Sequence, residues 1–465
     1  MSTLAYPPGP KSWHPLGQVF AFKNDLIGLL MNTTREYGDI AYINMAGRPL
    51  ILINDPDLIR DVTVTDHRKF IKSRALRLMK RLLGNGLITS EGEFHRDQQK
   101  MMQPSFRRDR IEAYARVMID DTIRCRDSWR ADQTYDIYQE MTKLSLGIAT
   151  KTLFHSDVDG EALELGECLT VAMKLFERSA NPMAEFLEKL PLPSNIAFRK
   201  AKRRLDETVR RMIDERRADG HDRGDLLSTI LAAQNEDTGA YMTDQQVLDE
   251  VITLFVGGHE TTALSLTWTW YLLSQNPEAA DRMYHEIDHV LKGNSPRALD
   301  VMNLDYTRRV FAESLRMYPP IYILAREALE DYPLREYTAH KGTAVVFSPY
   351  VMHRNPKYWD DPERFDPDRF TPEQEAARPK FAYLPFGAGP RGCIGEHFAR
   401  MEGTMALAII AQRWRLEHEP GHRVALEPLL SLRPKYGMKM IARERLAHVT
   451  PKHTEPAESF PAATA

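Results

Sequence analysis

The chain has 465 residues, of which 43% are hydrophobic and 27% charged, so it is long enough for one large globular domain or two to three ordinary ones. Its 62 Lys and Arg residues against 65 Asp and Glu residues give a formal net charge of -3, so nothing in it requires nucleic acid as a partner. The three cysteines, Cys125, Cys168 and Cys393, form no CxxC pair, which argues against a zinc site, an iron–sulfur site or a disulfide framework and fits a reducing cytoplasm.

No targeting or membrane segment is expected. Residues 1–30 contain no apolar run long enough for a signal peptide or a membrane anchor. Residues 251–273 approach transmembrane length, but Glu260 near their middle would be costly at a bilayer centre, so a helix buried through the protein core is the better interpretation. We therefore expect a cytoplasmic protein without a membrane anchor.

Residue patterns predict a mainly α fold with small β-sheets. In chain order, the predicted elements are a β-hairpin at 39–55, a helix with one apolar stripe and a solvated charged face at 203–217, a long helix through 251–273 and a strand at 342–348. The long helix begins with capping-box spacing at Thr243 and Gln246 and ends at Asn276-Pro277. It is apolar all round, so we expect it to be the spine of the fold.

The chain is expected to form a single domain. It shows no internal repeat and no convincing linker between residues 39 and 446, so that range is the predicted domain. Residues 1–38 would lead into it. Residues 447–465 are rich in Pro, Ala and Glu and are predicted to be disordered.

The most informative segment is a glycine-rich loop around one cysteine, Phe386 to Gly395 (FGAGPRGCIG). The residues from Glu396 onward have helical periodicity, so Cys393 lies just before a helix amino terminus, where the helix dipole and free N–H groups favour a thiolate. Gly387 and the neighbouring glycines let the backbone approach the sulfur closely. For an arbitrary Gly-Cys-Gly cluster, an inert buried cysteine would be the usual interpretation.

This loop matches the Phe-x-x-Gly-x-Arg-x-Cys-x-Gly signature of the cytochrome P450 family at every fixed position, and the chain resembles that family from about residue 39 to residue 434. The fixed positions are Phe386, Gly389, Arg391, Cys393 and Gly395. The resemblance implies the P450 fold, with the long helix over haem b and Cys393 as the axial thiolate of the iron. It also implies that Phe386 and Gly387 contact the haem, and that Arg391 and Arg326 pair with its propionates.

On the long helix, Gly257-Gly258-His259-Glu260-Thr261-Thr262 resembles the family's oxygen-binding segment, in which the helix opens locally to admit dioxygen and water. The resemblance implies that Thr261 and Glu260 carry the protons that the reaction consumes. Taken alone, the glycine pair would equally well indicate a kink or a packing site.

A structural ion-pair network is implied upstream of the cysteine. Glu313 and Arg316 are three residues apart on one predicted helix face, in the place of the family's Glu-x-x-Arg motif. The third member is ambiguous, because residues 361–370 (DPERFDPDRF) contain two similar copies of the motif that supplies it. The family pattern Phe-x-Pro-x-Arg-Phe fits the second copy, so we expect Arg369 rather than Arg364 to complete the network.

One expected propionate contact departs from the family pattern. In residues 92–106, His95 stands where tryptophan is commoner, and Gln99 stands where an arginine is expected. A propionate would then lose one cation. His95 or the adjacent Lys100 would have to replace it.

The resemblance implies a monooxygenase that inserts one oxygen atom from O2 into a hydrophobic substrate. A haem-thiolate isomerase or dehydratase, disfavoured by Glu260 and Thr261, and a non-catalytic haem sensor are the alternatives. Because no flavin or ferredoxin module is recognisable, electrons from NAD(P)H would arrive through a reductase and a ferredoxin or flavodoxin-type donor. The basic residues expected to receive an acidic donor behind the cysteine are Lys380, Arg391, Arg400 and Lys100. Pro7-Pro8-Gly9-Pro10 resembles the hinge that follows the membrane anchor in eukaryotic members of the family, and here it begins almost at the start of the chain. The resemblance therefore implies a soluble bacterial relative, and we expect a monomer.

Three segments would line the substrate pocket according to the resemblance, residues 71–90, 169–176 and 321–324, and they are rich in Leu, Ile and Met. In the first, cations alternate with leucines, which predicts either a solvated helix face or an amphipathic helix whose cations hold a carboxylate at the pocket mouth. These cations are Lys72, Arg74, Arg77, Lys80 and Arg81. We therefore expect a long hydrophobic substrate such as a fatty acid, with terpenoids or steroids as the alternative.

Overall fold

The structure is a computed structural model that describes the chain except for residues 1–5, 12–15, 155–189, 191 and 446–465. Its helices are α1 (Val19–Asn24), α2 (Leu26–Tyr37), α3 (Pro56–Arg60), α4 (Arg74–Leu78), α5 (Lys80–Leu83), α6 (Gly92–Met102), α7 (Arg108–Ser128), α8 (Ile137–Phe154), α11 (Pro193–Asp219), α12 (Leu226–Ala232), α13 (Asp244–Gln275), α14 (Pro277–Leu291), α15 (Asp305–Met317), α16 (Pro349–Met352), α17 (Pro372–Ala377) and α18 (Glu396–Ala411). Its strands are β1 (Ile40–Met45), β2 (Arg48–Ile53), β3 (Phe70–Lys72), β4 (Thr134–Asp136), β5 (Leu324–Ala328), β6 (Tyr332–Leu334), β7 (Tyr337–Ala339), β8 (Ala344–Phe347), β9 (Trp414–His418), β10 (Leu426–Pro428), β11 (Leu432–Pro434) and β12 (Lys439–Glu444).

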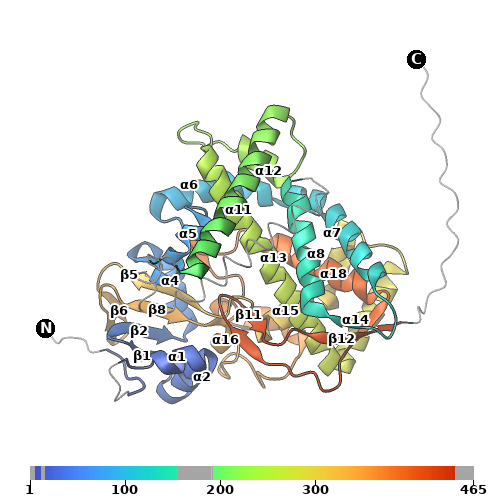
Figure 1. Ribbon diagram of the computed structural model, residues 1–465. Coiled ribbons are helices and arrows are strands. Elements are labelled where there is room, and N and C mark those ends of the chain that lie inside the picture. The colour runs from blue at the N-terminus through green and yellow to red at the C-terminus, as the bar shows by residue number, and fades with distance from the viewer. Residues whose placement is uncertain (1–5, 12–15, 155–189, 191, 446–465) are drawn as a thin grey trace, which may run out of the picture.

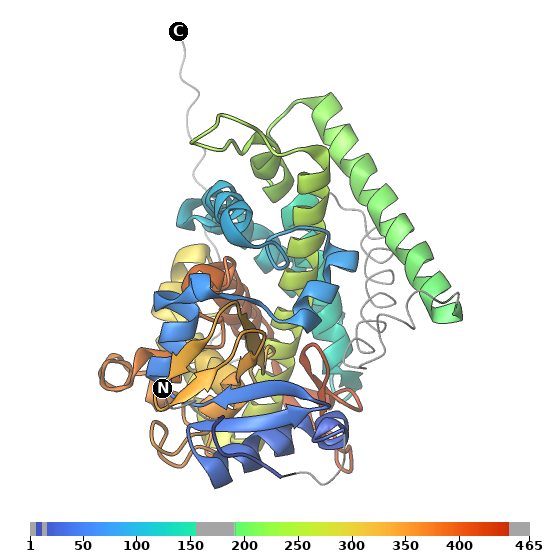
Figure 2. The same ribbon diagram turned by 90° about the vertical axis from the view of Figure 1, so that its left-hand side faces the viewer.

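Helices make up most of the molecule, and the small sheets lie in its lower part as drawn in Figure 1. Helix α13 runs through the centre and packs against α8, α11, α15 and α18. Figure 2 shows α11 (green) along the outer side of the molecule and strands β1 and β2 (blue) at its lower end. The predicted mainly α architecture is confirmed.

The predicted spine helix is also confirmed. The Gln246 backbone N–H donates to the Thr243 hydroxyl at 3.3 Å, and the Thr243 N–H donates to the Gln246 side-chain oxygen at 2.7 Å, so the capping box is complete. Most of α13 is buried, and Trp268 and Trp270 are fully so. Residues 257–261 are partly exposed although buried residues flank them on both sides, so other side chains do not cover the helix there.

The amino-terminal sheet brings distant segments together. The hairpin of β1 and β2 turns through Ala46 and Gly47, both at positive φ (55° and 79°), as a two-residue hairpin requires. Strand β2 pairs in parallel with β8, the strand predicted at 342–348, and the sheet continues through β5 to β3. Lys72 at the end of β3 thereby lies opposite Arg326 of β5.

Some local predictions differ from the structure or fall outside the described residues. The predicted amphipathic helix beginning near Lys72 is wrong, because Lys72 ends a strand and the following residues form two short helices, α4 and α5. Residues 1–38 do more than lead into a domain, since Leu26 and Leu30 of α2 pack against the sheet. The tail at 447–465 and the pocket segment at 169–176 lie outside the described residues. No helix in the described part of the chain is both long and apolar enough to cross a bilayer.

Candidate functional site

The cysteine loop is closed by its own backbone. The Cys393 N–H donates to the Phe386 carbonyl at 2.8 Å, and the Gly392 N–H donates to the Gly389 carbonyl at 2.9 Å. Gly389 has φ of 66°, and a Cβ atom there would lie 2.2 Å from the Thr63 carbonyl oxygen. This position therefore excludes any side chain, and the loop is held against the turn at Asp61–Thr65.

Cys393 lies two residues before Gly395, the N-cap of α18, as expected. Burial raises the pKa of its thiol to about 11, although a hydrogen bond to the Gly395 backbone acts in the opposite direction. The N–H group at the helix terminus thus favours the thiolate, as expected, but burial outweighs this contribution in the haem-free protein. The side chain nevertheless has exposed surface, so the sulfur is surrounded by protein without being covered by it. A metal that replaces the thiol proton would supply the charge compensation that the loop lacks.

Below the loop, Glu313 and Arg316 of α15 form a completely buried ion pair with an Nε–Oε2 distance of 2.6 Å. Arg369 Nε lies 3.5 Å from Glu313 Oε1 and the side chain is 9% exposed. The side chain of Arg364 is 62% exposed and pairs with Asp366 instead. Of the two look-alike arginines, the structure therefore brings Arg369 to the pair.

A histidine that the sequence did not single out connects this network to the cysteine loop. His353 is fully buried, its Nδ1 lies 3.0 Å from the Arg316 carbonyl, and its Nε2 lies 3.0 Å from the Leu384 backbone N–H. The first contact needs a proton on the ring and the second needs a lone pair, so the ring is neutral. Burial accordingly holds its pKa well below the usual value.

Four basic side chains gather around a single carboxylate beside the loop. Arg391 donates to the Ser90 carbonyl at 2.7 Å and to Glu91, and Lys72 Nζ donates to the same carbonyl at 2.9 Å. Burial, reinforced by the neighbouring cations, lowers the pKa of Lys72 to about 6, that of His95 to about 3 and that of Arg326 to about 10. The cluster therefore carries more basic groups than the acid present can balance.

The cation cluster contains candidates for the propionate cation that is missing at Gln99. Lys100 is wrong as a replacement, because its side chain is 51% exposed and its Nζ lies 3.4 Å from Asp237. His95 is in the cluster, as expected, and so is Lys72, which sequence reasoning placed at a pocket mouth. Sequence reasoning missed Lys72 because its place depends on strand pairing. The register of β3 and β5 puts Lys72 opposite Arg326.

Glu260 and Thr261 lie in the partly exposed stretch of α13, residues 257–261. A Cβ atom on Gly258 would have no neighbour within 4 Å, and one on Gly257 would meet only Ile88 at 3.8 Å. The helix stays regular here, without the local opening expected from the family resemblance. Instead, the Thr261 hydroxyl donates to the Gly257 carbonyl at 2.8 Å.

Glu260 is held by two side chains that the sequence did not nominate. Arg433 Nε donates to Glu260 Oε1 at 2.5 Å, and the Ser431 hydroxyl donates to the same oxygen at 3.1 Å. Both donors come from the β10–β11 hairpin, far away in sequence. Neither belongs to a recognisable motif, so the neighbouring sequence does not predict their contact with Glu260.

These features together fit a haem group. Its iron needs a ligand, for which Cys393 provides a thiol with exposed surface. Its two propionates need cations, which the excess of basic groups around Glu91 supplies. Around Gly257 and Gly258, α13 presents helix surface that neighbouring side chains leave largely open. The residues present would therefore hold the group expected from the sequence.

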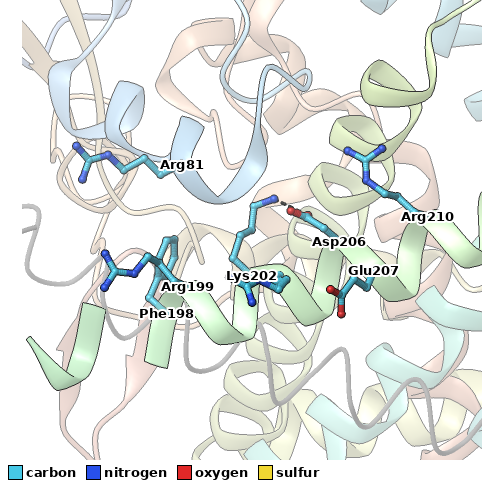
Figure 3. A pocket seen from close by; sticks show the side chains of 8 residues that line it. Arg81, Phe198, Arg199, Lys202, Asp206, Glu207 and Arg210 are labelled. Atoms are coloured by element: carbon cyan, nitrogen blue, oxygen red, sulfur yellow. Dashed lines mark hydrogen bonds and ion pairs between the residues drawn. The ribbon is translucent and has the colours of Figure 1, made fainter. Parts of the chain in front are cut away.

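A hollow on the surface of the described part of the chain has a charged lining. It has a volume of about 520 Å³ and lies between α5 and α11 (Figure 3). Its lining is charged apart from one aromatic ring and consists of Arg81, Phe198, Arg199, Lys202, Arg203, Asp206, Glu207 and Arg210. Lys202 and Asp206 pair across one turn of α11 at 2.5 Å. Such a lining suits solvent and ions better than an apolar ring system.

The fold and the site define a haem-thiolate protein, and comparison with known proteins identifies the family. The profile described as Cytochrome P450 matches residues 7–440. Cyclooctat-9-en-7-ol 5-monooxygenase of Streptomyces melanosporofaciens is 39% identical over 387 residues, which are 83% of this chain and 84% of that protein. Pentalenene oxygenase of Streptomyces avermitilis is 37% identical over 393 residues, which are 84% and 87% of the two chains. The crystal structure of the cytochrome P450DA heme domain has a TM-score of 0.86 and 29% identity, and the match covers 96% of this chain and 99% of that one.

The chain therefore belongs to the cytochrome P450 family. It is a haem-thiolate monooxygenase that uses haem iron and O2, and it acts on a lipophilic substrate with electrons from a redox partner. The predicted family, fold and enzyme class are confirmed, so the isomerase, dehydratase and sensor alternatives are set aside.

Proposed function

We propose that the substrate is a cyclic terpenoid rather than a fatty acid. The observation that carries this proposal is the 37% and 39% identity to enzymes named for pentalenene and for cyclooctat-9-en-7-ol. The contacts of two cations argue in the same direction. Arg77 is paired with Glu327 at 2.9 Å and Lys72 is buried in the cation cluster, so neither stands ready for a substrate carboxylate.

Cys393 is proposed to bind the haem iron through its sulfur, and Phe386 and Gly387 of the same loop would contact the haem. When bound, the haem supplies the activation of O2, of which one oxygen atom enters a C–H bond of the substrate and the other leaves as water with two protons and two electrons. Arg391, Arg326, Lys72 and His95 would hold the propionates, the two arginines as cations and His95 as a hydrogen-bond donor, because its low pKa keeps the ring neutral. The pKa of Lys72 is lowered to about 6 in the haem-free protein, so its amine would become a cation by taking up a proton beside a propionate. The network of Glu313, Arg316 and Arg369 fixes the position of the loop from below.

Thr261 and Glu260 are proposed as the groups that move protons. The hydroxyl of Thr261 can donate one proton and accept another, and it lies on the part of α13 that other side chains leave uncovered. To act, it must leave the Gly257 carbonyl, a single hydrogen bond whose net worth is about 1 kcal/mol. Glu260 adjoins it and exchanges protons through its carboxylate.

The electron donor is proposed to be an acidic ferredoxin or flavodoxin-type protein, supplied by an NAD(P)H-dependent reductase. Lys380 is exposed and Arg400 is partly so, and both flank the cysteine loop in sequence. Lys100 is also half exposed, beside Asp237, whereas Arg391 is mostly buried and directed at Glu91, which argues against a docking role for Arg391. A monomeric, cytoplasmic enzyme completes the proposal, with one domain in which α2 joins the range predicted at residues 39–446.

Binding titrations test the substrate class. Holoprotein is titrated with pentalenene, cyclooctat-9-en-7-ol, palmitic acid and, as a polar control, glycerol, while the haem absorption band is followed. The terpenoids are expected to shift the band at micromolar concentration and the other two compounds are not. A shift with palmitic acid alone would replace the terpenoid proposal by the fatty-acid one, and a shift with glycerol alone would overturn both.

A further inference from the structure

The hollow between α5 and α11 gathers positive charge on both of its walls. Five of its eight lining side chains are cations and two are carboxylates. Lys202 and Asp206 pair with each other at 2.5 Å. The rest of the lining consists of Glu207, one aromatic ring and four arginines, namely Arg81, Arg199, Arg203 and Arg210. An excess of one charge around a concave surface raises the local concentration of ions of the opposite charge, here anions.

The spacing of the cations along α11 places them on one face of the helix. Arg199, Arg203 and Arg210 follow each other at intervals of four and seven residues, which correspond to one and two helical turns. About 6 Å of helix rise separates Arg199 from Arg203, so both guanidinium groups can reach one bound anion. Both side chains are exposed, and within the described residues neither forms an ion pair. Arg81 of α5 lies near Arg199 at one end of the hollow, and Arg210 lies at the other end (Figure 3).

The size and the lining of the hollow indicate a small organic anion with more than one charge. Its volume of about 520 Å³ lies within the range of small-molecule sites and exceeds what a bare phosphate fills. An arginine fork matches two phosphate oxygens, and several forks together favour adjacent phosphates over a single carboxylate. The Phe198 ring supplies an apolar contact for the rest of the ligand. The chemical class that fits is an organic diphosphate.

A chain of hydrogen bonds leads from the hollow to the segment that follows α5. Arg210 donates to the Gln245 side-chain oxygen at 2.5 Å, and the Gln245 amide donates to Asp249 Oδ1 at 2.8 Å. The Asn85 backbone N–H donates to Asp249 Oδ2 at 2.7 Å. The two walls of the hollow are therefore joined through the first turns of α13.

The segment after α5 fits closely on α13. A Cβ atom on Gly84 would overlap Asp249 Oδ1, and one on Gly86 would overlap the Thr253 hydroxyl. Ile88 then reaches the open surface of α13, 3.8 Å from the place of a Cβ atom on Gly257. A displacement of α5 is therefore passed along the segment to the pocket wall, because the closely packed glycines leave it little freedom to absorb the movement.

We propose that the hollow between α5 and α11 is an effector site for an organic diphosphate, and that its occupancy is transmitted to residues 84–88 beside the substrate pocket. The anion attracts cations on both walls and reduces the repulsion between them. The walls are thereby held together, and the segment after α5 is held more firmly on α13. The site is independent of the proposed substrate and of the haem, since none of its lining residues belongs to the haem site.

Binding is measured by isothermal titration calorimetry of the holoprotein with sodium diphosphate at constant ionic strength. We expect a dissociation constant below about 1 mM. Arg199→Ala combined with Arg203→Ala should weaken binding by about tenfold or more, because two charge-assisted hydrogen-bond donors are lost. Haem content and the carbon monoxide spectrum verify that each variant is folded.

The matched control for charge is Arg116→Ala combined with Arg308→Ala, which removes two exposed arginines of α7 and α15 and should leave the affinity unchanged. Equal weakening by both double variants would show general charge attraction and overturn the site. Absence of any binding to the wild type would overturn it as well.

A free diphosphate and the phosphate headgroup of a lipid share this chemistry, and vesicles separate the two sources. The holoprotein is sedimented with phosphatidylglycerol vesicles and, as a neutral control, with phosphatidylcholine vesicles. Neither is expected to carry the protein down. Sedimentation with phosphatidylglycerol that Arg199→Ala and Arg203→Ala abolish, without binding of free diphosphate, would replace the small ligand by a lipid surface.

Transmission is measured by hydrogen–deuterium exchange of residues 84–90 in the substrate-free holoprotein. Saturating diphosphate should slow this exchange by about fivefold, the lower end of typical allosteric couplings. Gln245→Ala should retain diphosphate binding and lose the slowing, whereas Gln234→Ala, whose amide donates to the Gly239 carbonyl on a surface turn, should keep both. Unchanged exchange in the wild type with diphosphate bound would overturn the effector role, and slowing that persists in Gln245→Ala would overturn the path of transmission.

Discussion

Of the carboxylate–arginine pairs in the molecule, the one below the cysteine loop and the one on the central helix are built differently. All N–H groups of the Arg316 guanidinium have an acceptor, two on Glu313 and the others on the carbonyls of His353, Pro362 and Arg364. The Glu260 and Arg433 side chains are instead 12% and 21% exposed, so water reaches that pair. A pair that is saturated with partners fixes a structure, whereas one with competing water can change partners during a reaction.

The difference predicts opposite outcomes for substitutions on the two sides. Removing one partner from a buried pair leaves an uncompensated charge and costs about 3 to 5 kcal/mol, whereas a partly exposed pair is worth about 1 kcal/mol or less. Changes on the cysteine side should therefore reduce the amount of holoprotein. Changes on the helix side should leave the holoprotein intact and alter only how electrons and protons are used.

The largest effect is expected at the ligand itself. Cys393→Ser should abolish the thiolate-specific spectrum of the reduced, carbon monoxide-bound protein, because a serine hydroxyl is a poor ligand for the iron. Cys125→Ala is the matched control, since burial raises the pKa of that thiol to about 12 and leaves it unreactive. The spectrum of each purified variant decides, and its survival in Cys393→Ser would disprove the ligand assignment.

The next effect concerns the buried network. Arg369→Ala should destabilise the fold by about 3 kcal/mol and give little holoprotein, because it leaves the Glu313 carboxylate short of a cation in a dry environment. Arg364→Ala should be tolerated within about 0.5 kcal/mol, as its side chain is mostly exposed. Haem content per protein and chemical unfolding midpoints measure both. The reverse ranking would mean that the first copy of the motif supplies the third member.

An intermediate effect is expected in the cation cluster. Lys72→Met should speed haem transfer to apomyoglobin by about tenfold, since a hydrogen bond to a charged group is worth about 1.5 to 3 kcal/mol. Lys72→Arg should retain the haem. Transfer rates equal in Lys72→Met and wild type would remove Lys72 from the propionate site.

Lys72 also predicts that the free energy of unfolding of the haem-free protein depends on pH. Burial depresses its pKa from 10.5 to about 6, so between these values the unfolded chain binds a proton that the folded protein does not. Stability should therefore rise with pH across this window, by up to about 1.4 kcal/mol per unit, and the increment should be absent in Lys72→Met. Urea unfolding at pH 7 and pH 9 measures the difference, and parallel curves for the two proteins would contradict it.

The smallest effect on the fold is expected at Thr261. Thr261→Ala should keep its haem and its unfolding midpoint within about 1 kcal/mol, because the hydroxyl bonds only to a carbonyl that is already part of the helix. It should nevertheless divert electrons from product to hydrogen peroxide or water, while Thr261→Ser should not. The ratio of product to NADPH consumed, with pentalenene as the test substrate, measures this coupling. Equal coupling in Thr261→Ala and wild type would make Thr261 a packing residue.

Local signals in the sequence were sufficient for the long elements and for the cysteine loop. The capping box at Thr243 and the turn at Ala46-Gly47 are both formed as predicted, because each depends on residues a few positions apart. The pairing of Arg369 with Glu313 followed from a family motif.

The residues that were missed depend on contacts between remote segments. Lys72 continues an alternation of cations and leucines that indicates a helix, and only its pairing with Arg326 across two strands reveals its place. Ser431 and Arg433 reach Glu260 from a hairpin that has no motif of its own. Lys100 was chosen for its nearness to Gln99 in sequence, but its side chain points out of the protein toward Asp237.

The contact between Arg391 and the Ser90 carbonyl joins groups that are 301 positions apart in the chain. During synthesis at about 5 to 20 residues per second, this contact cannot form until most of the protein has left the ribosome. The cation cluster and the cysteine therefore become available only near the end of translation. Haem binding is then expected to be a late event in the maturation of the enzyme. A chain truncated before the cysteine loop would lack the residues that bind the haem.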